Sequence, residues 1–168
     1  MKITISDTIL PLIRTVRTRE EKDMLRDQMI MLEGALFRSE SQGYEKILKT
    51  RLPEHIAAAM RDILSRPSLK ESPEATRKLF HELKDTIDAL SLLKISLAFN
   101  PSEEMIQRLH EWIQKNLGVG VVLDISYDAS ILGGARIIFQ GKYKELTLSQ
   151  MITDTLAKEK TDVFKLIK

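Results

Sequence analysis

The hydrophobic pattern of this chain changes its period near residue 91, and this change constrains the fold more than any other feature. Before it, apolar residues recur every three or four positions, the spacing of a helix with one buried face. After it, apolar and polar residues alternate, as in a strand with one buried face. The alternating apolar residues are Leu93, Ile95, Leu97 and Phe99. The sequence therefore predicts an α+β protein, with a helical bundle over residues 1–90 and a small α/β domain over residues 91–168.

Helical spacing and capping signals divide the first half into short helices. Helices are expected over about residues 7–17, 19–40, 42–50, 53–65 and 73–90. At the start of the second, Thr18 and Glu21 have the spacing of a capping box, in which each side chain bonds a free backbone N–H. Apolar residues surround much of this helix, so it is expected to be central and mainly a core element. Met24 and Met31 lie on its flank and are the candidates for partner contact in the first half.

A helix and a second strand follow the strand at residues 93–99. Asn100 is expected to cap the helix, with Pro101 at its first position and Gly118 at its end. One apolar stripe on this helix, which includes the only tryptophan, is expected in the core. The stripe consists of Met105, Ile106, Leu109, Trp112, Ile113 and Leu117. Alternation resumes over residues 119–127, so a strand–helix–strand crossover is predicted.

Residues 128–145 combine a turn, a glycine pair and a hairpin. Gly133 and Gly134 stand at the start of an apolar strand, where adjacent glycines indicate a bulge or a close approach of backbones. The segment Gln140-Gly141-Lys142 predicts the hairpin turn. Thr147 and Gln150 then start a further helix with capping-box spacing. The apolar residues expected to face inward on this helix are Leu148, Met151, Ile152 and Leu156.

The composition disfavours several classes of protein. The 26 Lys and Arg residues nearly balance the 24 Asp and Glu residues, and neither half is strongly basic, so no nucleic-acid partner is expected. The chain has no cysteine, which excludes disulfides and thiolate zinc sites. Its apolar runs are shorter than the roughly 18 residues needed to span a bilayer, and its start lacks signal-peptide character. Direct membrane insertion is therefore not expected.

Residue types that often carry catalysis are present, but without the spacing that catalysis needs. His55, His81 and His110 fall on separate predicted helices and are expected at surfaces or helix ends, rather than as metal ligands. The segment Gly118-Val119-Gly120 follows a helix and precedes a strand, the reverse of a dinucleotide loop. Ser130 lacks the Gly-x-Ser-x-Gly context of an activated nucleophile. The prediction is a non-catalytic protein with no cofactor and no metal.

The C-terminal segment carries a second candidate for partner contact. Terminal segments rarely keep several large apolar residues without a surface to bury them. The residues concerned are Val163, Phe164, Leu166 and Ile167. Docking onto the chain's own domain and docking onto a partner helix both stay open.

The order of elements over about residues 91–157 resembles the C-terminal domain of the F-type ATP synthase delta subunit, whose family includes the mitochondrial oligomycin-sensitivity-conferring protein. That order is strand, Asn-Pro-capped helix, strand, glycine pair, hairpin and helix. The most specific residues of the resemblance are Asp128, Ile131, Leu132, Gly133, Gly134 and Gly141. The chain diverges from the family in a shorter helical domain, and in Glu145-Leu146-Thr147 where the family has an Asp-Gly-Ser-like segment.

The resemblance implies a non-catalytic subunit of the peripheral stalk, which links the catalytic head to the stalk helices and resists rotor torque. It implies that the helical domain binds the N-terminal segment of an alpha subunit, while the α/β domain and tail contact the b-type stalk helix. It also implies a place at the cytoplasmic face of the bacterial membrane. Two alternatives stay open: a general two-domain adaptor, and a small ligand-binding or regulatory enzyme domain with a polar pocket near Gly133-Gly134.

Overall fold

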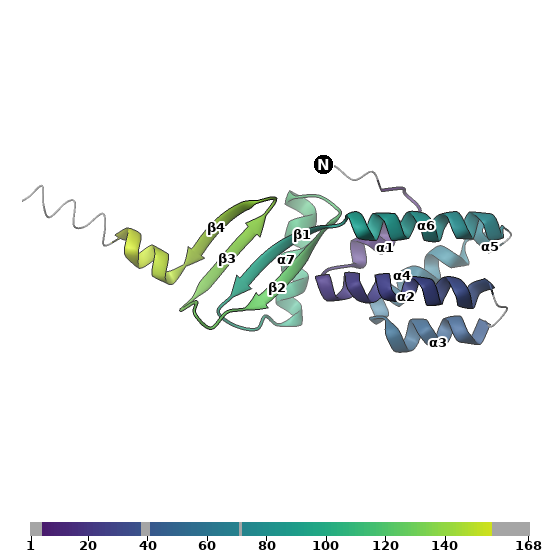
Figure 1. Cartoon of the computed structure of the whole chain (residues 1–168), viewed down its shortest axis with the longest axis horizontal. Helices are drawn as coiled ribbons and strands as arrows, with labels where there is room; N and C mark the ends of the chain where they lie inside the picture. Colours follow the sequence, from purple (N-terminus) through teal and green to yellow (C-terminus); the bar gives the residue numbers. More distant parts are fainter. Residues whose placement is uncertain (1–4, 38–40, 71, 156–168) are drawn as a thin grey trace, which may run out of the picture.

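The computed structural model describes residues 5–37, 41–70 and 72–155. As predicted, the protein is α+β, with a helical part followed by a four-stranded mixed sheet (Figure 1). The helical part contains α1 (Leu10–Thr15), α2 (Arg19–Phe37), α3 (Ser41–Arg51), α4 (Glu54–Ser65), α5 (Pro67–Lys70) and α6 (Pro73–Ala89). The second part contains β1 (Ser91–Leu97), α7 (Glu103–Asn116), β2 (Val121–Tyr127), β3 (Gly134–Phe139) and β4 (Lys142–Thr147).

Side-chain hydrogen bonds fix where two of the longer helices begin. At the start of α2, Thr18 Oγ1 accepts from the Glu21 backbone N–H at 3.3 Å. The Glu21 carboxylate accepts from the N–H of Arg17 at 2.7 Å rather than from that of Thr18, so only half of the predicted capping box forms. At the start of α6, Ser72 Oγ accepts from the Ala75 N–H at 3.2 Å.

The helix beside the sheet begins two residues later than predicted. Ser102, not Asn100, is the N-cap of α7, and its hydroxyl accepts from the backbone N–H of Met105 at 3.3 Å. Asn100 lies in the preceding loop. Glu103 and Glu104 occupy the first turn, where the helix dipole favours negative charge.

The helical part encloses one large aliphatic and methionine core. Leu25, Met29 and Leu32 on α2 face this core, as predicted for the central helix. The largest fully buried side chains around them are Ile9, Leu12, Ile13, Leu48, Ile56, Met60, Ile63, Leu83 and Ile87. Because helices of this length are marginal alone, this shared packing supplies most of their stability.

The sheet has the strand order β2-β1-β3-β4. β1 and β2 are parallel, with Leu93 opposite Leu123, and α7 connects them as the predicted crossover. β3 is antiparallel to both β1 and β4, so β4 runs in the same direction as β1. α7 lies on one face of the sheet, over a second and smaller core (Figure 1). The buried members of that core are Leu93, Ile95, Leu97, Ile113, Val121 and Leu123.

The helical part and the sheet are joined by hydrogen bonds as well as by the chain connection after α6. The Arg17 carbonyl accepts from the N–H of Leu123 at 2.9 Å, and Thr18 forms a parallel bridge with Leu123. This short segment therefore extends the sheet beyond the outer edge of β2. The residue before it on β2, Val122, points to the other face of the sheet and is buried in the core of the helical part. The two parts thus share packing across their boundary.

Residues 148–155 are helical and project beyond the end of β4, on the side of the sheet away from the bundle (Figure 1). Thr147 Oγ1 accepts from the N–H of Gln150 at 3.3 Å, so the predicted cap forms. The prediction that the apolar side of this helix faces inward is wrong: Leu148, Met151 and Ile152 are 48, 64 and 49% exposed. The fourth residue of the predicted stripe, at position 156, lies outside the described residues.

Candidate interaction surfaces

The motif that carries the family resemblance forms the loop between β2 and β3. The Asp128 carboxylate accepts from the backbone N–H of Ser130 at 2.9 Å and from its hydroxyl at 2.6 Å, which closes a tight turn. The Ile131 N–H donates to the Asp128 carbonyl at 3.1 Å. Ile131 is buried, whereas Leu132 is exposed to solvent. Asp128 and Ile131 therefore shape and anchor this loop.

Gly134 is the position at which the glycine pair is sterically required. Its φ is +95°, and a Cβ there would lie 2.0 Å from the Leu146 carbonyl oxygen on β4. The close backbone approach that the pair predicts therefore occurs at Gly134. At Gly133 an added Cβ would meet only the Leu148 Cβ, at an ordinary 3.7 Å. Gly141, with φ +76°, lies in the predicted hairpin turn between β3 and β4.

A polar network on the face of the sheet opposite α7 ties this loop to β3 and β4. Arg136 Nη1 donates to the Asp128 carboxylate at 2.9 Å, and Arg136 Nε lies 3.5 Å from Glu145. The Tyr143 and Thr147 hydroxyls donate to Glu145 at 2.6 and 2.7 Å, and these bonds lower the pKa of Glu145. The serine bonds described above lower the pKa of Asp128. Both carboxylates stay ionised as partners of Arg136, whereas a catalytic acid needs a raised pKa.

The helical part has a small groove between α2 and α6. Its volume is about 150 Å³, and its lining residues are Met29, Ile30, Glu33, Arg77, Phe80, His81 and Lys84. Met29 and Phe80 are buried, whereas Ile30 is exposed. Two cationic side chains, Arg77 and Lys84, face a single carboxylate, Glu33. The groove therefore suits an apolar side chain carried by a segment that also bears negative charge.

The two methionines predicted as partner contacts lie on an exposed face of α2. Met24 is 39% exposed and Met31 is 57% exposed. They are separated by about two helical turns, so they share that face. Neither lines the α2–α6 groove, although Met31 directly follows the groove residue Ile30. The other predicted contacts, Val163, Phe164, Leu166 and Ile167, lie outside the described residues.

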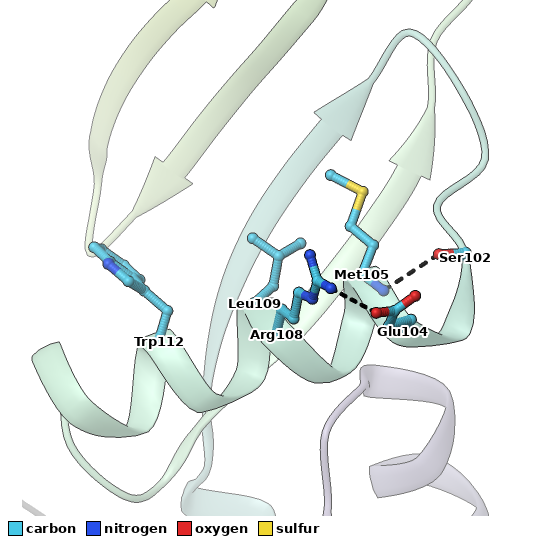
Figure 2. Close-up of a pocket in the computed structure, with 6 residues that line it drawn as sticks. All are labelled: Ser102, Glu104, Met105, Arg108, Leu109 and Trp112. Carbon is cyan, nitrogen blue, oxygen red and sulfur yellow. Dashed lines mark hydrogen bonds and ion pairs between the residues drawn. The ribbon is translucent and has the colours of Figure 1, made fainter.

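A larger groove runs along α7 (Figure 2). Its volume is about 540 Å³, and it is lined by Ser102, Glu104, Met105, Arg108, Leu109 and Trp112. Figure 2 shows Met105, Leu109 and Trp112 leaving α7 on the same side, with Trp112 directed toward the β3–β4 hairpin. Arg108 and Glu104 form an ion pair beside them, with 2.6 Å between Nη2 and Oε1. This groove is mainly apolar, with a charged pair along its rim.

The prediction that Trp112 lies in the core is wrong, because its side chain is 57% exposed. The apolar stripe of α7 is wider than the contact between this helix and the sheet. Ile113 is buried against the strands, whereas Met105 and Trp112 fall at the margin that lines the groove. The width of the stripe was visible in the sequence, but the partial cover that α7 provides was not.

The prediction that His110 lies at a surface or helix end is also wrong. Its side chain is only 4% exposed, and its Nε2 lies 3.0 Å from the Arg14 carbonyl oxygen on α1. Gln114 Nε2 donates to the same oxygen at 2.8 Å. Burial lowers the pKa of His110, so the imidazole is neutral at pH 7. His110 therefore holds α7 against the end of α1. Its spacing from Ile106 and Ile113 on the inner face was the available sequence signal.

A charged cluster completes the junction between the helical part and the sheet. Arg17 pairs with Glu21 on α2 and with Glu103 at the start of α7. Arg19 Nη1 lies 3.2 Å from Asp124 on β2. Burial by itself would raise the pKa of Glu21, but the hydrogen bonds and charge of Arg17 outweigh it and lower that pKa. The cluster joins residues far apart in the chain, so local sequence patterns do not reveal it.

Neither a scan against models of protein families nor a search of curated proteins finds a match to this chain. Within the described ranges, no group of three His, Asp or Glu side chains is placed to hold a metal ion. None of the helices described in the structure is both long enough and apolar enough to cross a membrane. In the described part of the chain, the two grooves and the exposed apolar residues of α2, α7 and β4 are candidate surfaces for a partner.

Proposed function

We propose that this chain is a peripheral-stalk subunit of a proton-translocating F-type ATP synthase, at the cytoplasmic face of a bacterial membrane. One observation carries the proposal: a helical bundle leads directly into a β–α–β–β–β–α unit in which Gly134 packs its backbone against β4. The same order of elements and the same glycine pair carry the resemblance to the delta subunit. In this role the chain catalyses no reaction and holds the catalytic head to the stalk.

The helical part is the proposed site for the N-terminal segment of an alpha subunit. A helix lying over α2 and α6 would insert an apolar side chain above Met29 and Phe80 and direct acidic residues toward Lys84. Met24 and Met31 form a second exposed apolar area on a different side of α2 from the groove lining, which the same partner would have to wrap around α2 to reach. Methionine side chains adapt their shape readily, which suits a contact with a partner helix.

The sheet part is the proposed site for the b-type stalk helix. The groove beside Met105, Leu109 and Trp112 is several times larger than the groove of the helical part. An amphipathic helix buries its apolar face in a groove of this kind. The segment that includes Phe164 and Ile167 is proposed to add to the same contact.

The junction between the two parts is suited to a subunit that bears load. A stator has to transmit force between its two partners without its own parts turning against one another. The backbone bond from Leu123 to Arg17 and the contact of His110 with Arg14 hold the sheet and the bundle in one orientation. Shared burial of Val122 in the helical core acts in the same direction.

Affinity purification of the tagged chain from its native cells tests the proposal. We expect it to bring down the alpha subunit and the b-type stalk subunit. With purified protein, a peptide from the N-terminus of the alpha subunit should bind the chain at low salt. Lys84→Glu, which reverses a charge in the α2–α6 groove, should weaken this binding at least tenfold.

A control for that variant is Lys78→Glu, which makes the same charge change at an exposed position of α6 outside the groove lining. It should leave the affinity within twofold. If the tagged chain brings down other proteins and neither synthase subunit, and the peptide fails to bind, the stator proposal is wrong. A general adaptor then becomes the better account.

A further inference from the structure

The sheet has an apolar region that α7 leaves uncovered. Leu146 on β4 lies opposite Ala135 on β3, on the same face as Ile137 and therefore on the α7 side. Leu146 is exposed, and so is Trp112 on α7, which lines the groove. The other face of the same strands carries Arg136 and the polar network around it. A segment that covers the α7 side would therefore meet apolar atoms, and one that covers the other side would meet charges.

Among the described residues, the helix at 148–155 also has an exposed apolar face. Leu148, Met151 and Ile152 repeat at the spacing of one helix face, and all three are exposed. The described part of this helix covers about two turns, a length that is marginal in water without a surface to pack on. Polar residues occupy the opposite side of this segment, including Ser149 and Thr153.

The topology places this helix at the entrance of the α7 groove. β4 and β1 run in the same direction, and α7 begins shortly after β1 ends. The first turn of α7, with Met105, therefore lies at the end of the sheet where β4 finishes. Leu148 is held at that end because its backbone N–H donates to the Gly133 carbonyl at 2.8 Å. A helix that turned back from Leu148 over the apolar face would run beside α7 in the same direction.

The lengths match. Residues 148–155 and residues 105–112 have the same number of residues, so as helices each spans about 12 Å. We propose that the chain's own helix from residue 148 docks into the groove along α7, with Leu148, Met151 and Ile152 packed against Leu109, Trp112 and Leu146. In the structure the helix projects away from the groove, which we take as the open position. The closed position needs a change of backbone dihedrals after Leu148 and the loss of the Gln150 N–H bond to Thr147 Oγ1.

The attachment of the helix favours its own chain as the occupant. A segment tethered directly at the groove has an effective concentration in the millimolar range, which a second copy in solution does not reach. The closed form would shield the apolar groove in the free protein, and a partner helix for the same groove would have to displace it. This inference is independent of the stator role, because it concerns the free chain alone.

The single tryptophan makes the closed form measurable in the full chain. In the closed form Trp112 is covered, so its emission is blue-shifted and acrylamide quenches it weakly. The double variant Met151→Lys/Ile152→Lys should shift the emission to the red and raise the quenching constant at least twofold. The control Ser149→Lys/Thr153→Lys adds the same charge on the polar side of the same helix and should change neither value. Circular dichroism should show that both variants stay folded, because all four positions are exposed.

A crosslink identifies which segment occupies the α7 groove. Because the chain has no natural cysteine, only the introduced cysteines can react. Leu109→Cys combined with Ile152→Cys, treated with a short bismaleimide at low protein concentration, should yield a crosslinked monomer. Leu109→Cys combined with Thr153→Cys should crosslink several-fold less. A crosslinked dimer whose yield rises with concentration would assign the groove to a second copy and overturn the proposal. Absence of any crosslink, with Trp112 emission equal in all variants, would overturn it as well.

Discussion

The helical part and the sheet part bury their apolar residues to different extents. In the helical part the core residues of α1, α2, α4 and α6 are enclosed on all sides, and the groove between α2 and α6 is small. In the sheet part α7 covers only some of the strands, and Trp112 and Leu146 stay exposed. Apolar residues left uncovered in an otherwise well-packed protein mark a surface that another segment covers. The bundle thus encloses its core and leaves exposed apolar residues mainly on α2, while the sheet part leaves apolar residues of both α7 and β4 uncovered.

The largest expected effect is on the free energy of unfolding, and it compares a buried isoleucine of the helical core with an exposed leucine of the sheet. Ile56→Ala removes a fully buried side chain from the helical core and should lower the free energy of unfolding by about 4 kcal/mol. Leu146→Ala removes an exposed side chain from β4 and should cost less than about 1 kcal/mol. Urea unfolding followed by circular dichroism measures both. Equal losses for the two variants would show that Leu146 is packed as tightly as a residue of the helical core, which a surface groove does not allow.

The next effect concerns the backbone contact that closes the sheet. Gly134→Ala places a Cβ against the Leu146 carbonyl at a positive φ, and should lower the free energy of unfolding by about 3 kcal/mol. Gly141→Ala is the matched control, because its φ is also positive but an added Cβ has open space. It should cost about 1 kcal/mol. Similar losses in urea unfolding would mean that only the dihedral angle matters at Gly134.

A smaller effect tests the junction between the two parts. Arg17→Met removes the arginine partner of the buried Glu21 carboxylate and leaves His55 Nε2, at 3.2 Å, as its basic neighbour, and should cost about 2 kcal/mol. Arg108→Met removes an ion pair whose two side chains are both exposed, and should cost no more than about 0.5 kcal/mol. Thermal unfolding of both variants gives the comparison. An unchanged melting temperature for Arg17→Met would show that the Arg17 ion pairs do not stabilise the contact between the helical part and the sheet.

The smallest effect is a pH dependence that comes from His110. Burial lowers its pKa in the folded state below the ordinary 6.5, so the unfolded state binds a proton at a higher pH than the folded state. Stability should therefore fall as the pH drops below about 6.5. Glu21, whose pKa is lowered from 4.5, acts only in a more acidic range and loses its contribution as the pH falls through its folded value.

His110→Gln removes the group that titrates and keeps a side chain able to reach the Arg14 carbonyl. Its free energy of unfolding should depend less on pH between 7 and 5 than that of the original chain. His81→Gln, at an exposed position on α6, is the control and should keep the original slope. Parallel slopes for all three proteins would place the imidazole of His110 in solvent.

Local patterns predicted most of the fold because local chemistry decides it. The change of period near residue 91, the cap at Thr147 and the turn at Gly141 each depend on neighbours in the chain. The start of α7 was misplaced because Asn100 and Ser102 are both good caps, and only the structure shows which hydroxyl or amide meets the third N–H.

The candidate surfaces were predicted less well, because they depend on how much of one element another covers. The apolar stripe of α7 and that of residues 148–155 are both present in the sequence. Whether Trp112 or Met151 is buried depends on the position of the whole helix relative to the sheet. The burial of His110 depends on Arg14, which is far away in the chain and carries no matching signal.

The central claim is that the helical part and the sheet part bind different partners. Hydrogen–deuterium exchange of the full chain tests it most directly, measured with a synthetic segment of each proposed partner in turn. The account predicts that the N-terminal segment of the alpha subunit slows exchange in α2 and α6, while the b-type stalk helix slows exchange in α7 and β4. Each segment should leave the other part unchanged. Protection of the same part by both segments, or no protection by either at low salt, would contradict it.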